Sequence, residues 1–264
     1  TISSLCSGDS VLLQITEMPD VTYQWYLNSG TVGSNSNELY AKASGTYQVA
    51  VYNSLNCSAT STNSINIVVN NKPTLPSVSY GNTTICQGNS VAFNTSSISG
   101  LNYQWKNDGA NISGATTSQY SATSSGNYSL QITNSSLCSV ETPEVTVTVN
   151  SIPTSPIIDL PSTNSFCNGD SILLQTIYQD GIDWLVNGIS TGINSNIIYA
   201  KTGGKYSVKV TNTNLCEAIS TNFVDLTMNQ LPTLPTVSTG ETSICEGNSV
   251  NFLVDNNPLV TYQW

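Results

Sequence analysis

The feature that most constrains this chain is a set of landmarks that recur about every 80 residues. The four tryptophans are separated by 80, 79 and 80 positions: Trp25, Trp105, Trp184 and Trp264. Each follows a cysteine that opens a Cys-x-Gly-(Asp/Asn)-Ser-(Val/Ile) phrase: Cys6, Cys86, Cys167 and Cys245. A second cysteine set follows the first by 51, 52 and 49 residues: Cys57, Cys138 and Cys216. Landmarks that keep one period over a whole chain indicate a tandem repeat.

A Pro-Thr-x-Pro phrase separates the repeats, at residues 73–76, 153–156 and 232–235. Each proline fixes φ and pushes the preceding residue toward an extended conformation, so the phrase predicts a stiff spacer rather than a flexible tether. The repeats are predicted at residues 1–70, 71–150, 151–229 and 230–264. The first is expected to lack its opening strand and the last to stop half built. We therefore expect the natural polypeptide to continue beyond both ends.

The second repeat shows the strand pattern most clearly. Period-2 alternation, with Val91 and Phe93 pointing inward, is typical of half-buried strands. Along residues 128–133, Tyr128, Leu130 and Ile132 are predicted inside and Ser129 outside. About seven short strands are expected, at or within residues 83–85, 90–94, 103–105, 111–116, 119–122, 128–133 and 145–149. With no helix-period segment, the pattern predicts an all-β chain of antiparallel sandwiches of about 80 residues, arranged end to end.

Composition excludes several classes of function. The chain has no His and all six of its basic residues are Lys, so the usual groups for proton transfer and for binding phosphate are missing. The net charge of −10 argues against a nucleic-acid partner. No apolar run approaches the roughly 18 residues of a membrane helix. We expect no enzyme activity, no cofactor, no metal site and no membrane span in this part of the polypeptide.

The order GNSV, YQW, ISGAT, GNY, ITN and VTVTV in the second repeat resembles an immunoglobulin domain of the intermediate type. The resemblance implies a buried core tryptophan on the third strand and a tyrosine corner, whose hydroxyl bonds back to the chain. The residues that match these two features are Trp25, Trp105, Trp184, Tyr47, Tyr128 and Tyr206. The match departs at the usual inter-sheet disulfide: where the family has Cys, two residues after the corner Tyr, this chain has Val49, Leu130 and Val208.

Seven cysteines at repeating positions suggest disulfides and an oxidising compartment. Pairing within modules would give Cys6–Cys57, Cys86–Cys138 and Cys167–Cys216. In an immunoglobulin-like fold, however, the two cysteines of a module lie at opposite ends of the sandwich, too far apart to bond. We therefore favour pairing between neighbouring modules, Cys6–Cys138 and Cys86–Cys216, and keep the local pairing as the alternative. The remaining cysteines, Cys57, Cys167 and Cys245, would pair with further modules.

Other candidate sites are weaker. Asp180 and Asp183 flank a glycine but lack the dense acidic ladder of a calcium loop, so a solvated loop is expected. Several asparagines open Asn-x-Ser/Thr sequons: Asn56, Asn82, Asn94, Asn111, Asn127 and Asn134. Ser10 and Ser171 lie in Asp-Ser-aliphatic phrases that resemble the O-glycosylation acceptor of Bacteroidota.

The Cys-x-Gly-x-Ser-Val opening, the Tyr-Gln-Trp strand and the Cys before the last strand together resemble repeats of giant Bacteroidota cell-surface proteins. These include gliding-motility adhesins exported by the type 9 secretion system. The resemblance covers the whole chain and implies an extracellular, disulfide-stiffened stalk or fibre shaft. Its partners would be further copies of the repeat, and other chains in a fibre or surface glycans. The alternatives are that the repeats themselves bind polysaccharide or neighbouring chains, or that they are accessory modules of a secreted hydrolase.

Overall fold

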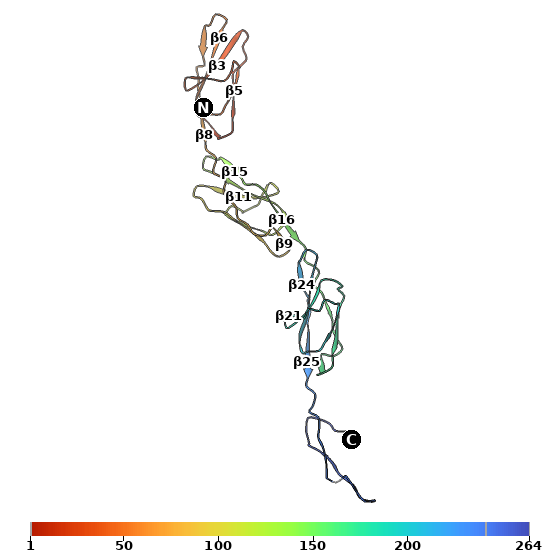
Figure 1. The fold of residues 1–264 in the computed structure, drawn as a ribbon. Coiled ribbons are helices and arrows are strands. Elements are labelled where there is room, and N and C mark those ends of the chain that lie inside the picture. Colours follow the sequence, from red (N-terminus) through yellow and green to blue (C-terminus); the bar gives the residue numbers. More distant parts are fainter. Residues whose placement is uncertain (1, 241, 264) are drawn as a thin grey trace. The chain divides into compact units, whose positions relative to one another are not determined.

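The computed structural model describes residues 2–240 and 242–263 of the chain (Figure 1). Every regular element in this part is a β-strand, and no helix in it is long and apolar enough to cross a membrane. The chain forms two compact units, Thr1–Asn150 and Ser151–Trp264. Trp264, the tryptophan landmark of the fourth repeat, lies outside the described residues.

The first module folds into two sheets of antiparallel strands, apart from one parallel pair. The larger sheet has the order β1-β8-β6-β3-β4, with β7 also paired to β6, and the smaller sheet is β2-β5. Strand β1 runs parallel to β8, with Cys6 opposite Asn70. The strands are β1 (Ile2–Cys6), β2 (Val11–Gln14), β3 (Val21–Leu27), β4 (Gly30–Val32), β5 (Glu38–Ala41), β6 (Gly45–Asn53), β7 (Ser58–Thr60) and β8 (Ile65–Asn70).

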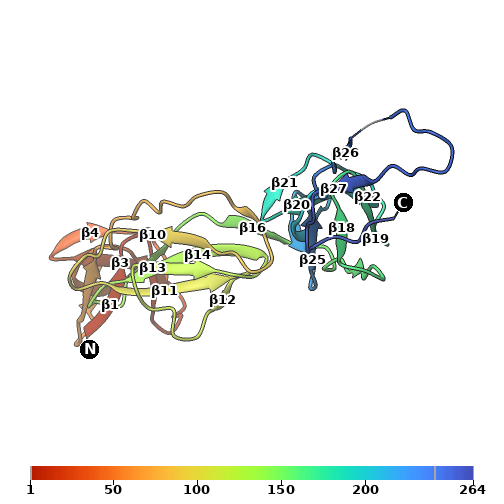
Figure 2. The ribbon, with the colours of Figure 1, turned by 90° about the horizontal axis from the view of Figure 1, so that it is seen from below.

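The second module repeats this plan within the same unit (Figure 2). Its larger sheet is β12-β11-β14-β16-β9, with β15 paired to β14, and its smaller sheet is β10-β13. The strands are β9 (Thr84–Cys86), β10 (Val91–Asn94), β11 (Asn102–Asn107), β12 (Ala110–Asn111), β13 (Gln119–Ala122), β14 (Gly126–Thr133), β15 (Ser139–Glu141) and β16 (Val145–Asn150).

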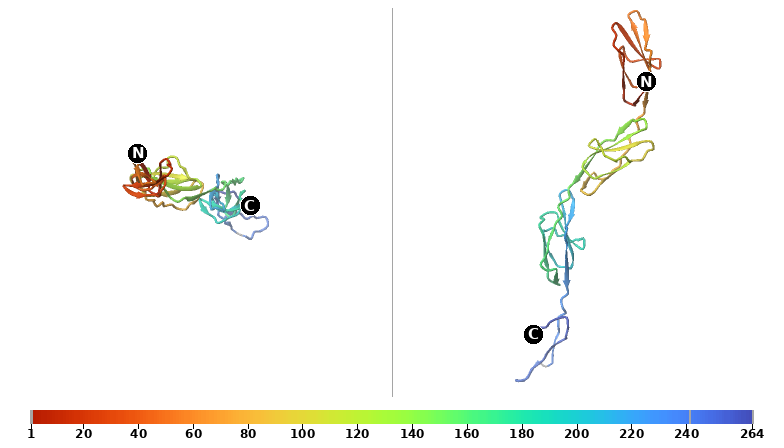
Figure 3. Two further views of the ribbon diagram at one scale, coloured as in Figure 1. Left: turned by 90° about the horizontal axis from the view of Figure 1, so that it is seen from above. Right: turned by 180° about the vertical axis from the view of Figure 1, so that it is seen from behind.

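The third module, coloured green to blue in Figure 3, adds a first strand to the smaller sheet. Its sheets have the orders β17-β19-β22 and β18-β25-β23-β20-β21, with β24 paired to β23. Its strands are β17 (Ile158–Asp159), β18 (Ser165–Cys167), β19 (Ile172–Thr176), β20 (Ile182–Val186), β21 (Ile189–Ser190), β22 (Ile197–Ala200), β23 (Gly204–Thr211), β24 (Glu217–Ile219) and β25 (Val224–Asn229). The described part of residues 230–264 holds one hairpin-like pair, β26 (Val237–Thr239) and β27 (Phe252–Val254).

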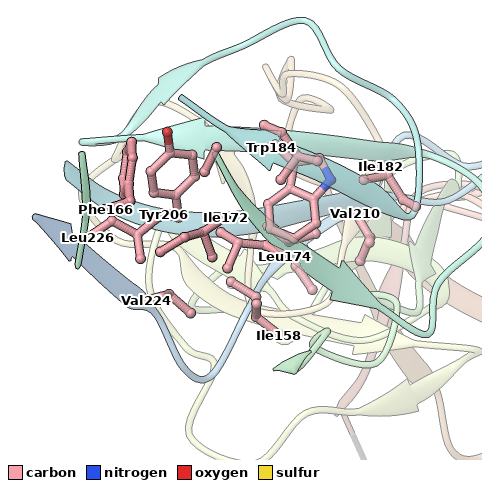
Figure 4. Close-up of a cluster of buried hydrophobic side chains, with 14 residues drawn as sticks. Ile158, Phe166, Ile172, Leu174, Ile182, Trp184, Tyr206, Val210, Val224 and Leu226 are labelled. Atoms are coloured by element: carbon pink, nitrogen blue, oxygen red, sulfur yellow. The ribbon is translucent and has the colours of Figure 1, made fainter. Parts of the chain in front are cut away.

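Each of the three modules has its own core, centred on the tryptophan of its third strand. Trp25, Trp105 and Trp184 are at most 3% exposed. Their indole N–H groups donate to backbone oxygens of the following loops, at 2.8–3.0 Å. Figure 4 shows the Trp184 ring among Leu174, Ile182 and Val210. A buried Trp with its polar atom satisfied is the arrangement expected at the centre of an immunoglobulin-like sandwich.

The tyrosine corners are present in all three modules. The hydroxyl groups of Tyr47, Tyr128 and Tyr206 each donate to the carbonyl oxygen four residues earlier, at 3.0, 2.9 and 2.9 Å. Two residues further on, where a family cysteine would stand, Val49, Leu130 and Val208 are buried. The chain is therefore a tandem array of immunoglobulin-like sandwiches whose cores are closed by aliphatic packing.

The structure differs from the predicted strand pattern at two points in the second module. The predicted last strand, 145–149, lies in β16, but β15 before it was not predicted; Pro143, in the gap between the two, has no N–H for the ladder with β14. Ser129, predicted outside, is 1% exposed. Its hydroxyl donates to Glu141 Oε1 at 2.6 Å, and Lys106 pairs with the same carboxylate. Lys106 and Ser129 hold the pKa of Glu141 below its usual range.

Candidate functional site at the module junction

The first cysteine set lies at the end of the sandwich from which the linker leaves the module. Cys6 closes β1, opposite the last residue of β8, Asn70. The Ser7 N–H donates to the Asn70 carbonyl at 2.8 Å, and the Asp9 N–H closes the turn back to Cys6 at 3.0 Å. Gly8, within that turn, has φ of 93°, a conformation that explains the invariant Gly of the Cys-x-Gly phrase in all four repeats.

The second cysteine set lies at the opposite end of each sandwich, in the turn before β7, β15 or β24. Asn134 opens the turn of the second module, and its side-chain Oδ1 accepts the N–H groups of Ser136 at 3.1 Å and Cys138 at 3.0 Å. The Asn134 N–H donates to the Cys138 carbonyl at 3.0 Å. These hydrogen bonds fix the position of Cys138, which is 0% exposed.

A disulfide joins Cys6 of the first module to Cys138 of the second, with their Cα atoms 5.5 Å apart. This distance lies in the ordinary range for a disulfide. The bond spans 132 positions of sequence, so it closes a loop that contains most of the first two modules. The structure thus brings together the pair that we favoured for this junction.

Three non-covalent contacts fix the linker beside this bond. Asn134 Nδ2 donates to the carbonyl of Asn71, the first linker residue, at 2.8 Å. Lys72, the next residue, donates its backbone N–H to Ser7 Oγ at 3.3 Å and places its Nζ 3.3 Å from Asp9 Oδ1. The joint is therefore held by the chain itself, a disulfide, hydrogen bonds from both modules and an ion pair.

The second unit contains a turn of the same construction. Asn212 Oδ1 accepts the N–H groups of Asn214 and Cys216, both at 3.0 Å, and Asn212 Nδ2 donates to the Ser151 carbonyl at 2.8 Å. Cys216 is 0% exposed. Cys86 and Cys216 are each disulfide-bonded, and their bond to one another stays a prediction.

The pairing within modules, Cys6–Cys57, Cys86–Cys138 and Cys167–Cys216, is wrong for this structure. Cys6 and Cys138 are bonded to each other, and Cys57, Cys167 and Cys245 are exposed free thiols. The physical reason is distance. The eight residues of β14 separate the two ends of the second sandwich by about 26 Å at ~3.3 Å per residue.

Asn134 was predicted only as a glycosylation candidate and turn residue, and the recurrence of an asparagine at this place in each of the three modules was missed. It stands four residues before each cysteine of the second set, as Asn53, Asn134 and Asn212. A search for Asn-x-x-x-Cys at the repeat period would have found it, because short Asn side chains that bond to the backbone ahead are typical of turns.

The glycosylation candidates divide by environment. Asn56, Asn82 and Asn111 are exposed, as are Ser10 and Ser171. The Asn127 side chain hydrogen-bonds to both Asp108 and Thr146. The Asn134 side chain donates to the Asn71 carbonyl at the junction. Asn94 exchanges backbone hydrogen bonds with Ser79. Modification at all these positions stays a prediction.

The two acids considered for a calcium loop are not alike. Asp180 is exposed, whereas Asp183 lies on β20, where its Oδ1 accepts the Ser190 hydroxyl at 2.7 Å and its Oδ2 is 3.9 Å from Lys209 Nζ. Within residues 2–240 and 242–263, no cluster of three or more His, Cys, Asp or Glu side chains could hold a metal ion.

Comparison with known proteins finds similar solved structures. No protein-family model matches the chain, and no curated protein sequence matches it. The titin I-band fragment I67–I69 is 12% identical, with 86% of this chain and 96% of that chain covered and a TM-score of 0.37. Extracellular domains 3–5 of Drosophila OTK are 14% identical, covering 86% and 94%, with a TM-score of 0.31. Murine CEACAM1b is 16% identical, covering 59% and 100%, with a TM-score of 0.31.

Proposed function

We propose that this chain is part of the extracellular stalk or fibre shaft of a large, repetitive bacterial surface adhesin. The observation that carries the proposal is the Cys6–Cys138 bond, which ties one module to the next instead of bracing one core. A disulfide placed at a joint contributes to holding neighbouring modules together, and it persists in an oxidising, extracellular compartment. The role is structural, without catalysis, and the partners are further copies of the same repeat.

The bond also changes how the chain carries tension. A force that enters the chain before Cys6 passes through the disulfide to Cys138 and bypasses the residues between them. Unfolding of the bypassed segment then adds no length to the shaft, although the sequence separation is 132 positions. Cores supply stability to each module, whereas the joint disulfide sets the greatest length to which the array can extend.

Single-molecule pulling of the 264-residue chain tests this role. Cys86→Ser and Cys216→Ser are introduced so that the Cys6–Cys138 bond acts alone. Reduction is expected to lengthen the fully extended chain by roughly 460 Å, from 132 positions at about 3.5 Å each. Cys138→Ser added to this background should show the longer extension without reductant. Equal extension before and after reduction would remove the mechanical role.

A further inference from the structure

The first and third modules share surface residues that the second module lacks. The phrase Gly-Asp-Ser-(Val/Ile)-Leu-Leu-Gln occupies residues 8–14 and 169–175, and Tyr-Ala-Lys occupies 40–42 and 199–201. The corresponding segments of the second module are Gly-Asn-Ser-Val-Ala-Phe-Asn at 88–94 and Ser-Ala-Thr at 121–123. These surface residues are therefore shared by alternate modules, whereas the fold itself is the same in every module.

These shared residues form an apolar row on the outer face of each smaller sheet. In the first module Leu12 on β2 is directly opposite Tyr40 on β5, and the two are 41% and 61% exposed. In the third module Leu173 on β19 is opposite Tyr199 on β22, at 46% and 60% exposed. Because strand side chains alternate, the buried neighbours Leu13 and Leu174 face the core while these pairs face outward.

The second module is a built-in control for this surface. At the same register it pairs Ala92 on β10 with Ser121 on β13, and both side chains are exposed. The fold therefore tolerates small side chains at these positions, so core packing does not require the Leu–Tyr pairs. An adjacent pair of exposed large apolar side chains thus recurs in the first and third modules for a reason other than core packing.

A lysine stands at one end of each row and an acid at the other. Lys42 and Lys201 follow the tyrosines by two residues, and among the described residues neither makes an ion pair, although the net charge is −10. In the first module Glu38, two residues before Tyr40, accepts a hydrogen bond from Gln14 at 2.8 Å.

In the third module the acid comes from a different strand. Asp159 on β17 is opposite Gln175 on β19, which in turn is opposite Ile197, two residues before Tyr199. We call the two surfaces the Leu–Tyr faces, made of Leu12, Gln14, Glu38, Tyr40 and Lys42 in the first module and Asp159, Leu173, Gln175, Tyr199 and Lys201 in the third.

We propose that the Leu–Tyr faces are self-association surfaces on which a second copy of this chain packs face to face. With the facing strands antiparallel and Tyr40 at the centre, Lys42 of each copy lies over Glu38 of the other. This follows because the two charges flank Tyr40 by two residues on either side. The face of the first module is thus self-complementary, as an isologous interface requires, with aromatic side chains at its centre and charges at its rim.

Sedimentation velocity of the intact chain over a range of concentrations tests the surface. The wild type is expected to show reversible association. The variant with Tyr40→Ser and Tyr199→Ser, which places the second module's residue at both positions, should associate at least about tenfold more weakly. Leu55→Ser, which removes an apolar side chain that is 81% exposed outside both faces, is the matched control and should leave association unchanged. Circular dichroism melts establish that all variants are folded.

Charge reversal tests the packing orientation in a Tyr199→Ser background, where the first face acts alone. Lys42→Glu and Glu38→Lys should each weaken association, and the two together should restore it, because the reversed face is again self-complementary. A wild type that stays monomeric up to ~1 mM would overturn the proposal. So would association that survives the tyrosine changes. Saturable polysaccharide binding by a monomeric wild type, lost in the tyrosine variant, would assign the faces to a glycan instead.

Discussion

The turn before β15 and the turn before β7 are built alike but differ in chemistry. In each, an asparagine, Asn134 or Asn53, accepts the N–H groups two and four residues further on, at 2.9–3.1 Å. Cys138 at the end of the first turn is fully buried and bonded to Cys6, whereas Cys57 at the end of the second is an exposed thiol. The local sequence therefore forms the turn, and a neighbouring module supplies the burial and the bond.

This difference separates two sources of order in the array. Each core is closed by residues of its own module, whose indole, tyrosine-corner and aliphatic contacts repeat three times with little change. The joint depends on residues that are far apart in sequence and that come from two modules. Within this 264-residue chain, changes in the turn before β15 should therefore affect the coupling of the first two modules, whereas the same changes before β7 should act locally, because Cys57 is unbonded here.

Replacing Cys138 should have the largest effect. Cys138→Ser is expected to cost about 2–5 kcal/mol of unfolding free energy, the usual range for losing a native disulfide. It should also expose Cys6 to maleimide labelling. Cys57→Ser, the matched change in the other turn, should stay within about 0.5 kcal/mol because that thiol is exposed and unbonded. Denaturant unfolding with thiol counting measures both; equal costs for the two variants would contradict the comparison.

Changing the asparagines should have an intermediate effect. Asn134→Asp keeps the Oδ1 acceptor but removes the Nδ2 donor to the Asn71 carbonyl, so about 1 kcal/mol of stability should be lost. In Asn53→Asp both local hydrogen bonds to Oδ1 remain, and the cost should be clearly smaller.

Denaturant unfolding gives the free energies, and amide hydrogen exchange around residues 70–72 reports on the linker directly. Faster exchange there is expected in Asn134→Asp alone. If Asn53→Asp cost as much, the linker contact would carry none of the difference between the turns.

Sequence predicted the local parts of this molecule well, and long-range contacts explain most of what it missed. Residues 119–122 were predicted as a strand and form β13 unchanged, because alternation is a local signal. The burial of Ser129 could not be predicted from alternation, since Lys106 and Glu141 come from the two neighbouring strands to cover it. The Leu–Tyr faces were not predicted from the sequence, because their residues are shared by the first and third modules and differ in the second.

Leu137 offers the smallest and most local test of the same comparison. It lies just before Cys138 with φ of 63° and is 81% exposed, while the matching residue of the first module, Asn56, has φ of 60°. The left-handed region costs most residues roughly 1–2 kcal/mol but costs Asn less. Leu137→Asn should therefore stabilise the second module by about 0.5–1 kcal/mol, and Asn56→Leu should destabilise the first by a similar amount. Thermal unfolding of the two variants measures both stability changes.

Stability changes of opposite sign would mean that backbone strain is a property of the turn itself, and that the disulfide is formed despite it. Two effects of the same sign would show instead that the Leu137 side chain contributes to the joint.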